Sequence, residues 1–247
     1  MLRSTWWIPV VLAVAACGGD GGGATDAGDE PGADAGGVDA AIDAPVEAAA
    51  PTYPVYPGCD APATSFARTV TLDPATTTLA AAFAQKQIQP GDHVVVLPGD
   101  HGAVAVSKYT NPELVAATAW IWLDFQPGAK VQSLDVRDVS SWLVTHADVS
   151  APSTTLASFS GASNMVLADS HLYTVEDASS WTADAWINLA SNGISVRNGS
   201  CVALLRDKVL DTRFGIAITS DALARPDTSV KVLALGNEVA NFSGDAM

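Results

Sequence analysis

Four heptapeptides in the second half of the chain decide its fold: LVTHADV (143–149), VLADSHL (166–172), ALLRDKV (203–209) and LALGNEV (233–239). Their last residues lie 23, 37 and 30 positions apart. The first spacing matches one coil of a β-helix, which is roughly 20 to 25 residues long and lies within the range of solenoid repeats. The longer spacings predict loop insertions near residues 176–186 and 221–229. The repeat therefore predicts an all-β chain wound into stacked coils.

Alternate residues of each heptapeptide are expected to point into the interior of these coils, because successive side chains of a strand point to opposite faces. Eleven of the twelve residues that this rule places inside are apolar, as a stacked interior requires. The three predicted interior rows are Leu143/Val166/Ala203/Leu233, Thr145/Ala168/Leu205/Leu235 and Val149/Leu172/Val209/Val239.

The residues before the repeats have the pattern of a β-helix N-terminus. Residues 79–88 form a short amphipathic pattern, residues 93–97 an apolar strand, and Pro98-Gly-Asp100 a turn. This arrangement resembles right-handed parallel β-helix proteins of the pectate lyase superfamily, in particular polysaccharide lyases of the chondroitinase B and alginate lyase type. The resemblance implies that the helix caps the first coil and covers its edge. His101-Gly102 departs from that pattern, because those lyases prefer an aromatic residue there.

A β-sandwich of short strands is the competing fold. It explains the strand and turn composition, but it does not explain heptapeptides that can be superposed. An α/β fold is disfavoured because no helical period is sustained after Ile88.

The N-terminus has the composition of a secretory signal. Arg3 precedes an apolar stretch, Trp6–Ala16, that is too short to cross a bilayer. Val14-Ala-Ala-Cys17 resembles the lipobox of bacterial lipoproteins, which implies cleavage before Cys17 and acylation of that residue. We therefore expect a protein of the bacterial cell envelope, on the outer membrane or cell surface, that meets the membrane only through a lipid anchor.

Residues 18–57 are rich in Gly, Ala, Asp and Pro and contain eight acidic residues but no Lys or Arg. Such a segment buries too little apolar surface to offset its ordering entropy, so we expect a disordered tether. Similar Asp-Ala-Gly tethers follow the lipobox of many myxobacterial lipoproteins. The expected organisation is a signal peptide (1–17), a tether (18–57) and a β-helix domain (58–247).

The formal net charge of −15 argues against nucleic acid as a partner, since no basic patch is available to hold it. Cys59 and Cys201 would lie in a compartment that permits disulfides, but the sequence leaves open whether they pair. We expect a monomer. We also expect the β-helix to be incomplete, because Gly244–Met247 falls in a predicted turn with no cap after it.

Two outward-facing rows follow from the same register. The position before the last interior residue holds Asp148, His171, Lys208 and Glu238, and two residues earlier stand His146, Asp169, Arg206 and Gly236. Equivalent residues of stacked coils lie about 4.8 Å apart. We therefore expect these charged side chains to share one face of one sheet.

Polysaccharide, especially acidic polysaccharide, is the ligand that such a face suits. A polysaccharide lyase needs a cation to neutralise the uronate carboxylate and a base to remove the adjacent proton. The resemblance implies lysine and arginine in these roles, so Lys208 is the candidate base and Arg206 or Arg213 the candidate stabiliser. The candidate substrate contacts, which include one tryptophan for stacking on a sugar ring, are His146, Asp169, His171 and Trp142.

Other interpretations stay open at this stage. A glycoside hydrolase would need two converging carboxylates, and a noncatalytic β-helix would only bind glycan or space its partners at the cell surface. Ca²⁺ is a candidate cofactor, because calcium prefers oxygen ligands and an oxygen-rich group lies near the C-terminus. That group consists of Asp207, Asp211, Glu238, Asn241 and Asp245.

Overall fold

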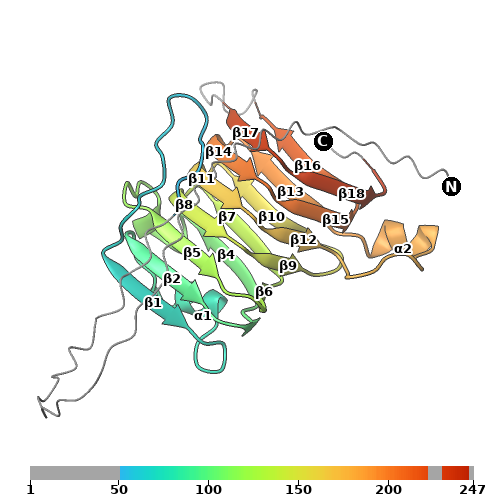
Figure 1. Cartoon of the computed structure of the whole chain (residues 1–247), viewed down its shortest axis with the longest axis horizontal. Helices are drawn as coiled ribbons and strands as arrows, with labels where there is room; N and C mark the ends of the chain where they lie inside the picture. Colours follow the sequence, from blue (N-terminus) through green and yellow to red (C-terminus); the bar gives the residue numbers. More distant parts are fainter. Residues whose placement is uncertain (1–50, 222–229, 245–247) are drawn as a thin grey trace, which may run out of the picture. The chain divides into compact units, whose positions relative to one another are not determined.

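The computed structural model describes residues 51–221 and 230–244, and these wind into a parallel β-helix of three sheets (Figure 1). Sheet A contains β1 (Arg68–Leu72), β2 (Asp92–Val96), β5 (Ile121–Phe125), β8 (Ser140–Thr145), β11 (Ser163–Ala168), β14 (Ser200–Leu205) and β17 (Lys231–Leu235). Sheet B contains β3 (Gly99–Asp100), β6 (Ala129–Val131), β9 (Asp148–Ser150), β12 (His171–Tyr173), β15 (Lys208–Thr212) and β18 (Glu238–Phe242). Sheet C contains β4 (Ala103–Ser107), β7 (Ser133–Arg137), β10 (Thr155–Ser160), β13 (Asn192–Arg197) and β16 (Phe214–Thr219).

The cross-coil register predicted from the four heptapeptides is confirmed. Val149, Leu172, Val209 and Val239 are paired neighbours on successive strands of sheet B. Leu143, Val166, Ala203 and Leu233 are paired in the same way in sheet A. Every strand pairing in the described ranges is parallel, so the β-sandwich alternative is wrong.

The predicted side-chain directions are right for sheet B and wrong for sheet A. Val149, Leu172 and Val209 belong to the main core, as expected. In sheet A, however, the main core contains the other alternate set: Trp142, Val144, Met165, Leu167, Val202 and Leu204. The predicted interior rows beginning at Leu143 and Thr145 lie on the outer face of this sheet, and both residues are buried there. Alternation gives no direction when both faces of a strand are covered by apolar groups.

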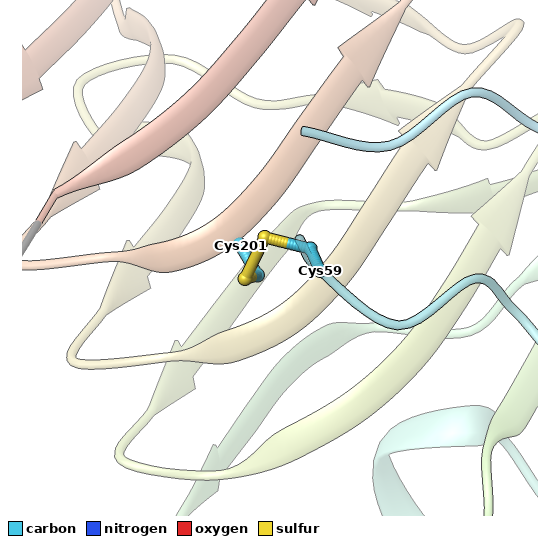
Figure 2. Close-up of a disulfide and its surroundings, with 2 residues drawn as sticks. All are labelled: Cys59 and Cys201. Carbon is cyan, nitrogen blue, oxygen red and sulfur yellow. A yellow bond between two sulfur atoms is a disulfide. The ribbon is translucent and has the colours of Figure 1, made fainter. Parts of the chain in front are cut away.

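A strap formed by residues 51–66 covers that outer face. Tyr53, Val55, Ala63 and Phe66 of the strap pack against Trp122, Leu143, Val166, Ala168, Ala203 and Leu205 in a second apolar cluster. Figure 2 shows the disulfide that fastens the strap: Cys59 is bonded to Cys201 on β14. Because Tyr53 is only 5% exposed, ordered packing begins before the domain boundary expected at residue 58.

The predicted N-terminal helix is α1 (Leu79–Ala84), and it lies between β1 and β2. Sheets B and C begin only after β2, so α1 takes the place of their first strands and packs against β4. Buried His101 fixes the helix, because its Nδ1 accepts a hydrogen bond from the Leu79 N–H (3.0 Å) while its Nε2 donates to the Leu97 carbonyl (2.7 Å). The residue that departs from the lyase pattern thus has a structural role.

The corner between sheets A and B has the same geometry in four coils. His146, Asp169, Arg206 and Gly236 all have positive φ, between 50° and 70°. This is the left-handed region that glycine adopts most easily. The next residue in each coil points into the corner, where side-chain oxygens accept backbone N–H bonds across coils: Asp207 Oδ1 from Ser170 (3.0 Å) and Asn237 Oδ1 from Asp207 (2.8 Å).

Two connections leave the regular coil. Residues 174–191, between β12 and β13, contain α2 (Ala183–Asn188) and confirm an insertion close to the first one predicted. The second predicted insertion lies mostly outside the described residues. A short 3-10 helix, η1 (Pro112–Leu114), joins β4 to β5.

Candidate functional site

The two predicted charged rows lie side by side, but not on one sheet face. Asp148, His171, Lys208 and Glu238 are paired neighbours that begin successive strands of sheet B. His146, Asp169 and Arg206 lie on the corner between sheets A and B, two residues before the first row. We call the first set the sheet B row and the second the corner row.

The sheet B row extends one coil further than the sequence analysis recognised. Lys130 pairs with Asp148 in the strand register, and their side chains lie 3.9 Å apart. Lys130 also contacts the hydroxyl of Tyr173 at 3.3 Å, and the Tyr173 ring stacks on His171 with ring centroids 4.5 Å apart. Residues 129–131 (AKV) match residues 147–149 (ADV), so the sequence carried a signal for this extension.

Arg206 is already engaged by groups of this chain. Its Nε and Nη2 atoms donate to the two carboxylate oxygens of Asp169, each at 2.7 Å. Its guanidinium lies 5.5 Å from the centre of the Tyr53 ring, and the Tyr53 hydroxyl donates to Asp169 at 3.3 Å. The Arg206 hydrogen bonds lower the pKa of Asp169, and burial together with Asp169 raises the pKa of Tyr53 to about 12. Arg206, the candidate stabiliser, and Asp169, a candidate substrate contact, therefore neutralise each other's charge.

The three candidate catalytic cations do not converge. Lys208 is exposed on sheet B, and its ammonium lies 3.9 Å from Glu238. Arg213 follows β15 at the opposite corner, between sheets B and C. Four residues lie between them, so their Cα atoms are at most about 17 Å apart at about 3.3 Å per residue. Lys208 and Arg213 therefore lie at opposite ends of β15, and Arg206 is held by Asp169.

Trp142 is not a substrate contact, and this correction follows from its burial. The side chain has no exposed surface and stacks on Phe83 inside the coil, with ring centroids 5.0 Å apart. The alternation in β8 turns Trp142 inward and Leu143 outward. A sugar cannot reach the indole in the folded protein.

A cleft of about 450 Å³ opens at the corner beside His146. We call it the corner cleft. Polar groups of Asp124, Gln126, His146 and Asp148 line it, together with the backbone turn at 127–129. Its volume falls in the range of small-molecule sites, and it contains two of the groups from the predicted rows. Asp124 and Gln126 were not among the predicted residues, because they lie in a coil before the recognised repeats.

Two histidines flank the Asp124 carboxylate in this cleft. His93 Nε2 lies 3.5 Å from Oδ2, and His146 Nδ1 lies 3.7 Å from Oδ1. Burial alone would raise the pKa of Asp124, but His93 and His146 together lower it. His93 stacks flat on Trp122 at 3.9 Å, so one wall of the carboxylate site is rigid. Asp124 is therefore an ionised acceptor at neutral pH.

The proposed calcium ligands do not gather at one place, although the side chains of Asp211 and Asn241 contact each other. Asp207 is buried inside the corner, Asp211 is buried after it on β15, and Glu238 is exposed on the outer face of sheet B. Asp245 lies outside the described residues. Within residues 51–221 and 230–244, no three His, Cys, Asp or Glu side chains converge as a metal site would require.

A second cleft, of about 350 Å³, lies at the corner between sheets B and C. We call it the Arg213 cleft. Ser153, Thr154 and Thr155 form one wall, Ile187 and Asn188 of α2 another, and Asn192 and Arg213 complete it. The sequence analysis included Arg213 but not the other residues, whose convergence depends on the path of the insertion at 174–191.

None of the helices in the part of the chain that the structure describes is long and apolar enough to span a membrane. Comparison of the chain with protein-family models, with curated proteins and with solved structures finds no match.

Proposed function

We propose that this β-helix binds polysaccharide at the cell envelope, and that it does so without cleaving the chain. The observation that carries the proposal is the position of the corner cleft, which is lined in part by Asp148 of the sheet B row. A polymer of repeating units could seat one sugar in the cleft and place its neighbours over Lys130, His171 and Lys208, one side chain per coil.

The groups in the corner cleft suit sugar hydroxyls. The Asp124 and Asp148 carboxylates accept hydrogen bonds, while the Gln126 amide and the His146 imidazole can both donate and accept. Gln126 is oriented by a hydrogen bond from its Nε2 to Asp124 (3.1 Å). Such preorganised polar groups at the edge of a cleft typically give orientation and specificity.

The same geometry argues against the lyase mechanism that the resemblance implies. That mechanism needs a free cation beside the base, whereas Arg206 is bonded to Asp169 and Arg213 lies at the other end of β15. Lys208 alone could accept a proton, but no charged partner in the described residues is placed to neutralise a uronate beside it. We therefore favour binding over catalysis.

Affinity electrophoresis in gels containing alginate or chondroitin tests this proposal. We expect the wild-type protein to be retarded, and His146→Ala and Gln126→Ala to weaken retardation by roughly fivefold each, the effect of one lost hydrogen bond. Ser195→Ala, on the outer face of sheet C, is the matched control and should behave as wild type.

Cleavage is measured in the same samples by ultraviolet absorbance of new unsaturated chain ends. We expect no increase in absorbance over time. Product formation that is lost in Lys208→Ala would establish the lyase instead. Equal retardation of wild type, His146→Ala and Gln126→Ala would remove the corner cleft as the binding site.

A further inference from the structure

We infer that the strap formed by residues 51–66 positions the binding groups of the corner cleft, and that its disulfide makes binding there sensitive to reduction. The inference rests on the function proposed above, because it names a regulator of the same cleft. Three features of the strap support it: the way it is fastened, the contacts at its two ends, and the exposure of its disulfide.

The strap is fastened by side chains rather than by strand pairing. Residues 51–66 contain no strand, and Tyr53 is the one buried residue among them. Apolar packing against sheet A, the hydrogen bond from the Tyr53 hydroxyl to Asp169 and the bond between Cys59 and Cys201 hold the strap in place (Figure 2). A segment without strand pairing can open locally while the β-helix beneath it stays folded.

One end of the strap packs behind the Asp124 carboxylate. The centre of the Phe66 ring lies 5.6 Å from that of Trp122 and 5.9 Å from that of His93. His93 Nε2 lies 3.5 Å from Asp124 Oδ2. Trp122 Nε1 donates to the Thr145 hydroxyl at 2.9 Å, and that hydroxyl donates to Asp124 Oδ1 at 3.4 Å. Phe66 therefore supports two groups that orient Asp124, and such support keeps a binding group in its productive position.

The other end of the strap contacts the corner row beside His146. The Tyr53 hydroxyl donates to Asp169 at 3.3 Å, and the Tyr53 ring lies 5.5 Å from the Arg206 guanidinium. Asp169 takes the position of His146 one coil later, and the His146 N–H donates to the Ala168 carbonyl at 3.1 Å. The corner that Tyr53 holds is thus bonded to the corner that presents His146.

The disulfide can be reached from solvent, because Cys59 and Cys201 are both partly exposed. Thiol–disulfide exchange with an external dithiol breaks the Sγ–Sγ bond and leaves two cysteine thiols. The dithiol is oxidised to its own disulfide, so two electrons and two protons pass from it to the cysteines. The loop between residues 59 and 201 is then open, and the strap gains conformational freedom. The groups behind Asp124 and His146 lose their support as a result.

Nuclear magnetic resonance of the histidine rings tests this positioning without any ligand. The chain has four histidines, and His93 and His146 are the two that flank Asp124. Reduction of the ¹⁵N-labelled full-length protein with dithiothreitol should shift the ring signals of both. The signals of His101 and His171 should stay in place, because the groups that these two rings contact do not belong to the strap.

Affinity electrophoresis of the oxidised and the reduced protein in alginate gels measures the effect on binding. Reduction should weaken retardation by about twofold to tenfold, which corresponds to the entropy cost of immobilising one side chain. Cys59→Ser/Cys201→Ser should show the weaker retardation with or without dithiothreitol. Phe66→Ala should weaken retardation to a similar extent with the disulfide intact.

Tyr56→Ala is the matched control, because Tyr56 is an exposed ring of the strap that does not belong to the apolar cluster. It should be retarded as wild type is, and it should respond to dithiothreitol as wild type does. Urea unfolding of each protein checks that it is folded under the conditions of the gel.

Three outcomes would overturn the inference: unchanged His93 and His146 signals on reduction, shifts of all four histidines together, or equal retardation of the oxidised and the reduced wild type. Shifts of all four histidines would indicate a general loss of structure. A wild type that alginate does not retard in either state would contradict the proposed function. The histidine signals would then still decide whether the strap positions the cleft.

Discussion

Asp207 and Asn237 occupy equivalent positions in the corner between sheets A and B, but only Asn237 satisfies both polar atoms of its side chain. Asn237 occupies the same position one coil later, where its amide both accepts from Asp207 and donates to the Leu204 carbonyl (3.0 Å). Asp207 accepts from Ser170 through Oδ1, but its Oδ2 is buried and has no hydrogen-bond partner among the described atoms. Burial raises the pKa of Asp207 to about 8, so the folded protein keeps this carboxyl protonated at neutral pH.

We predict that Asp207→Asn removes a pH dependence of stability. The folded pKa lies above the unfolded value, so the folded state binds the extra proton between about pH 4 and about pH 8. The resulting stability is complete below pH 4 and is lost as pH rises to 8, at up to about 1.4 kcal/mol per pH unit. Urea unfolding of wild type at several pH values should show this loss.

Asp207→Asn should instead unfold at nearly constant urea concentration over that range, because an amide can donate without a proton from solution. Asp60→Asn, at an exposed position, is the control and should follow wild type. If the stability of wild type and of Asp207→Asn changes with pH in the same way, the Asp207 carboxyl does not titrate between about pH 4 and about pH 8.

Trp142 illustrates a limit of residue-level prediction. Its neighbours across the coils, Ile121 and Met165, are apolar, but so is the alternate row that includes Leu143. The sequence could not show which row faces inward, because the strap that buries the second row lies some 80 residues earlier in the chain. The assignment of Trp142 to a sugar contact failed for that reason.

Trp142→Ala should lower the free energy of unfolding by about 3–5 kcal/mol, the usual cost of emptying a large aromatic site. Trp142→Phe should cost less, since it keeps an aromatic ring against Phe83 and removes an indole N–H that has no partner among the described residues. The folded Trp142→Phe variant should bind alginate with wild-type affinity in the gel assay. A loss of affinity at unchanged stability would instead return Trp142 to the binding surface.

At the scale of elements, the sequence predicted the coils and their register, but it did not predict the backbone conformation of the corners or the clefts that form there. The row of Val149, Leu172, Val209 and Val239 could be aligned because each heptapeptide ends on a valine or leucine. Gly236, Asp169 and His146 belong to residue types that adopt the left-handed region more often than others, but Arg206 adopts the same φ without such a signal. The corner cleft and the Arg213 cleft depend on such corners and on loop paths, so neither could be predicted.

The strap is the element whose removal has the clearest expected effect. Its disulfide closes a loop between residues 59 and 201, and cross-links over loops of this length typically stabilise a fold by about 2–5 kcal/mol. We expect Cys59→Ser/Cys201→Ser to unfold at lower urea concentration by that amount. Hydrogen exchange should accelerate first in β8, β11 and β14, because the strap covers their outer apolar residues.

Dithiothreitol provides the control for this prediction. It should bring wild type close to the double variant and leave the double variant unchanged. If exchange in the three strands stays at the wild-type rate after reduction, the apolar contacts of Tyr53 and Phe66 hold the strap without the disulfide.

At the scale of the whole molecule, the β-helix and the lipid anchor are separate predictions. The fold follows from the stacking of parallel strands, whereas the anchor rests on Val14-Ala-Ala-Cys17 and its resemblance to a lipobox. The acidic composition of residues 18–50 is what we expect of a spacer, since like charges favour an extended chain. A binding surface held away from the membrane would be free to meet an extracellular polymer.

We predict that Cys17→Ser abolishes attachment to the membrane while leaving the β-helix intact. Acylation gives about 0.8 kcal/mol of membrane affinity for each buried methylene, so more than one acyl chain on Cys17 would hold the protein firmly. Expressed in a bacterial host with an alkyne-labelled fatty acid, wild type should carry the label and enter the detergent phase on phase separation. Cys17→Ser should lose both properties and unfold like wild type. Cys59→Ser/Cys201→Ser should keep the label, which assigns it to Cys17. A labelled Cys17→Ser protein would show that a residue other than Cys17 is acylated. An unlabelled wild type would contradict the prediction that a lipid anchor holds the protein on the membrane.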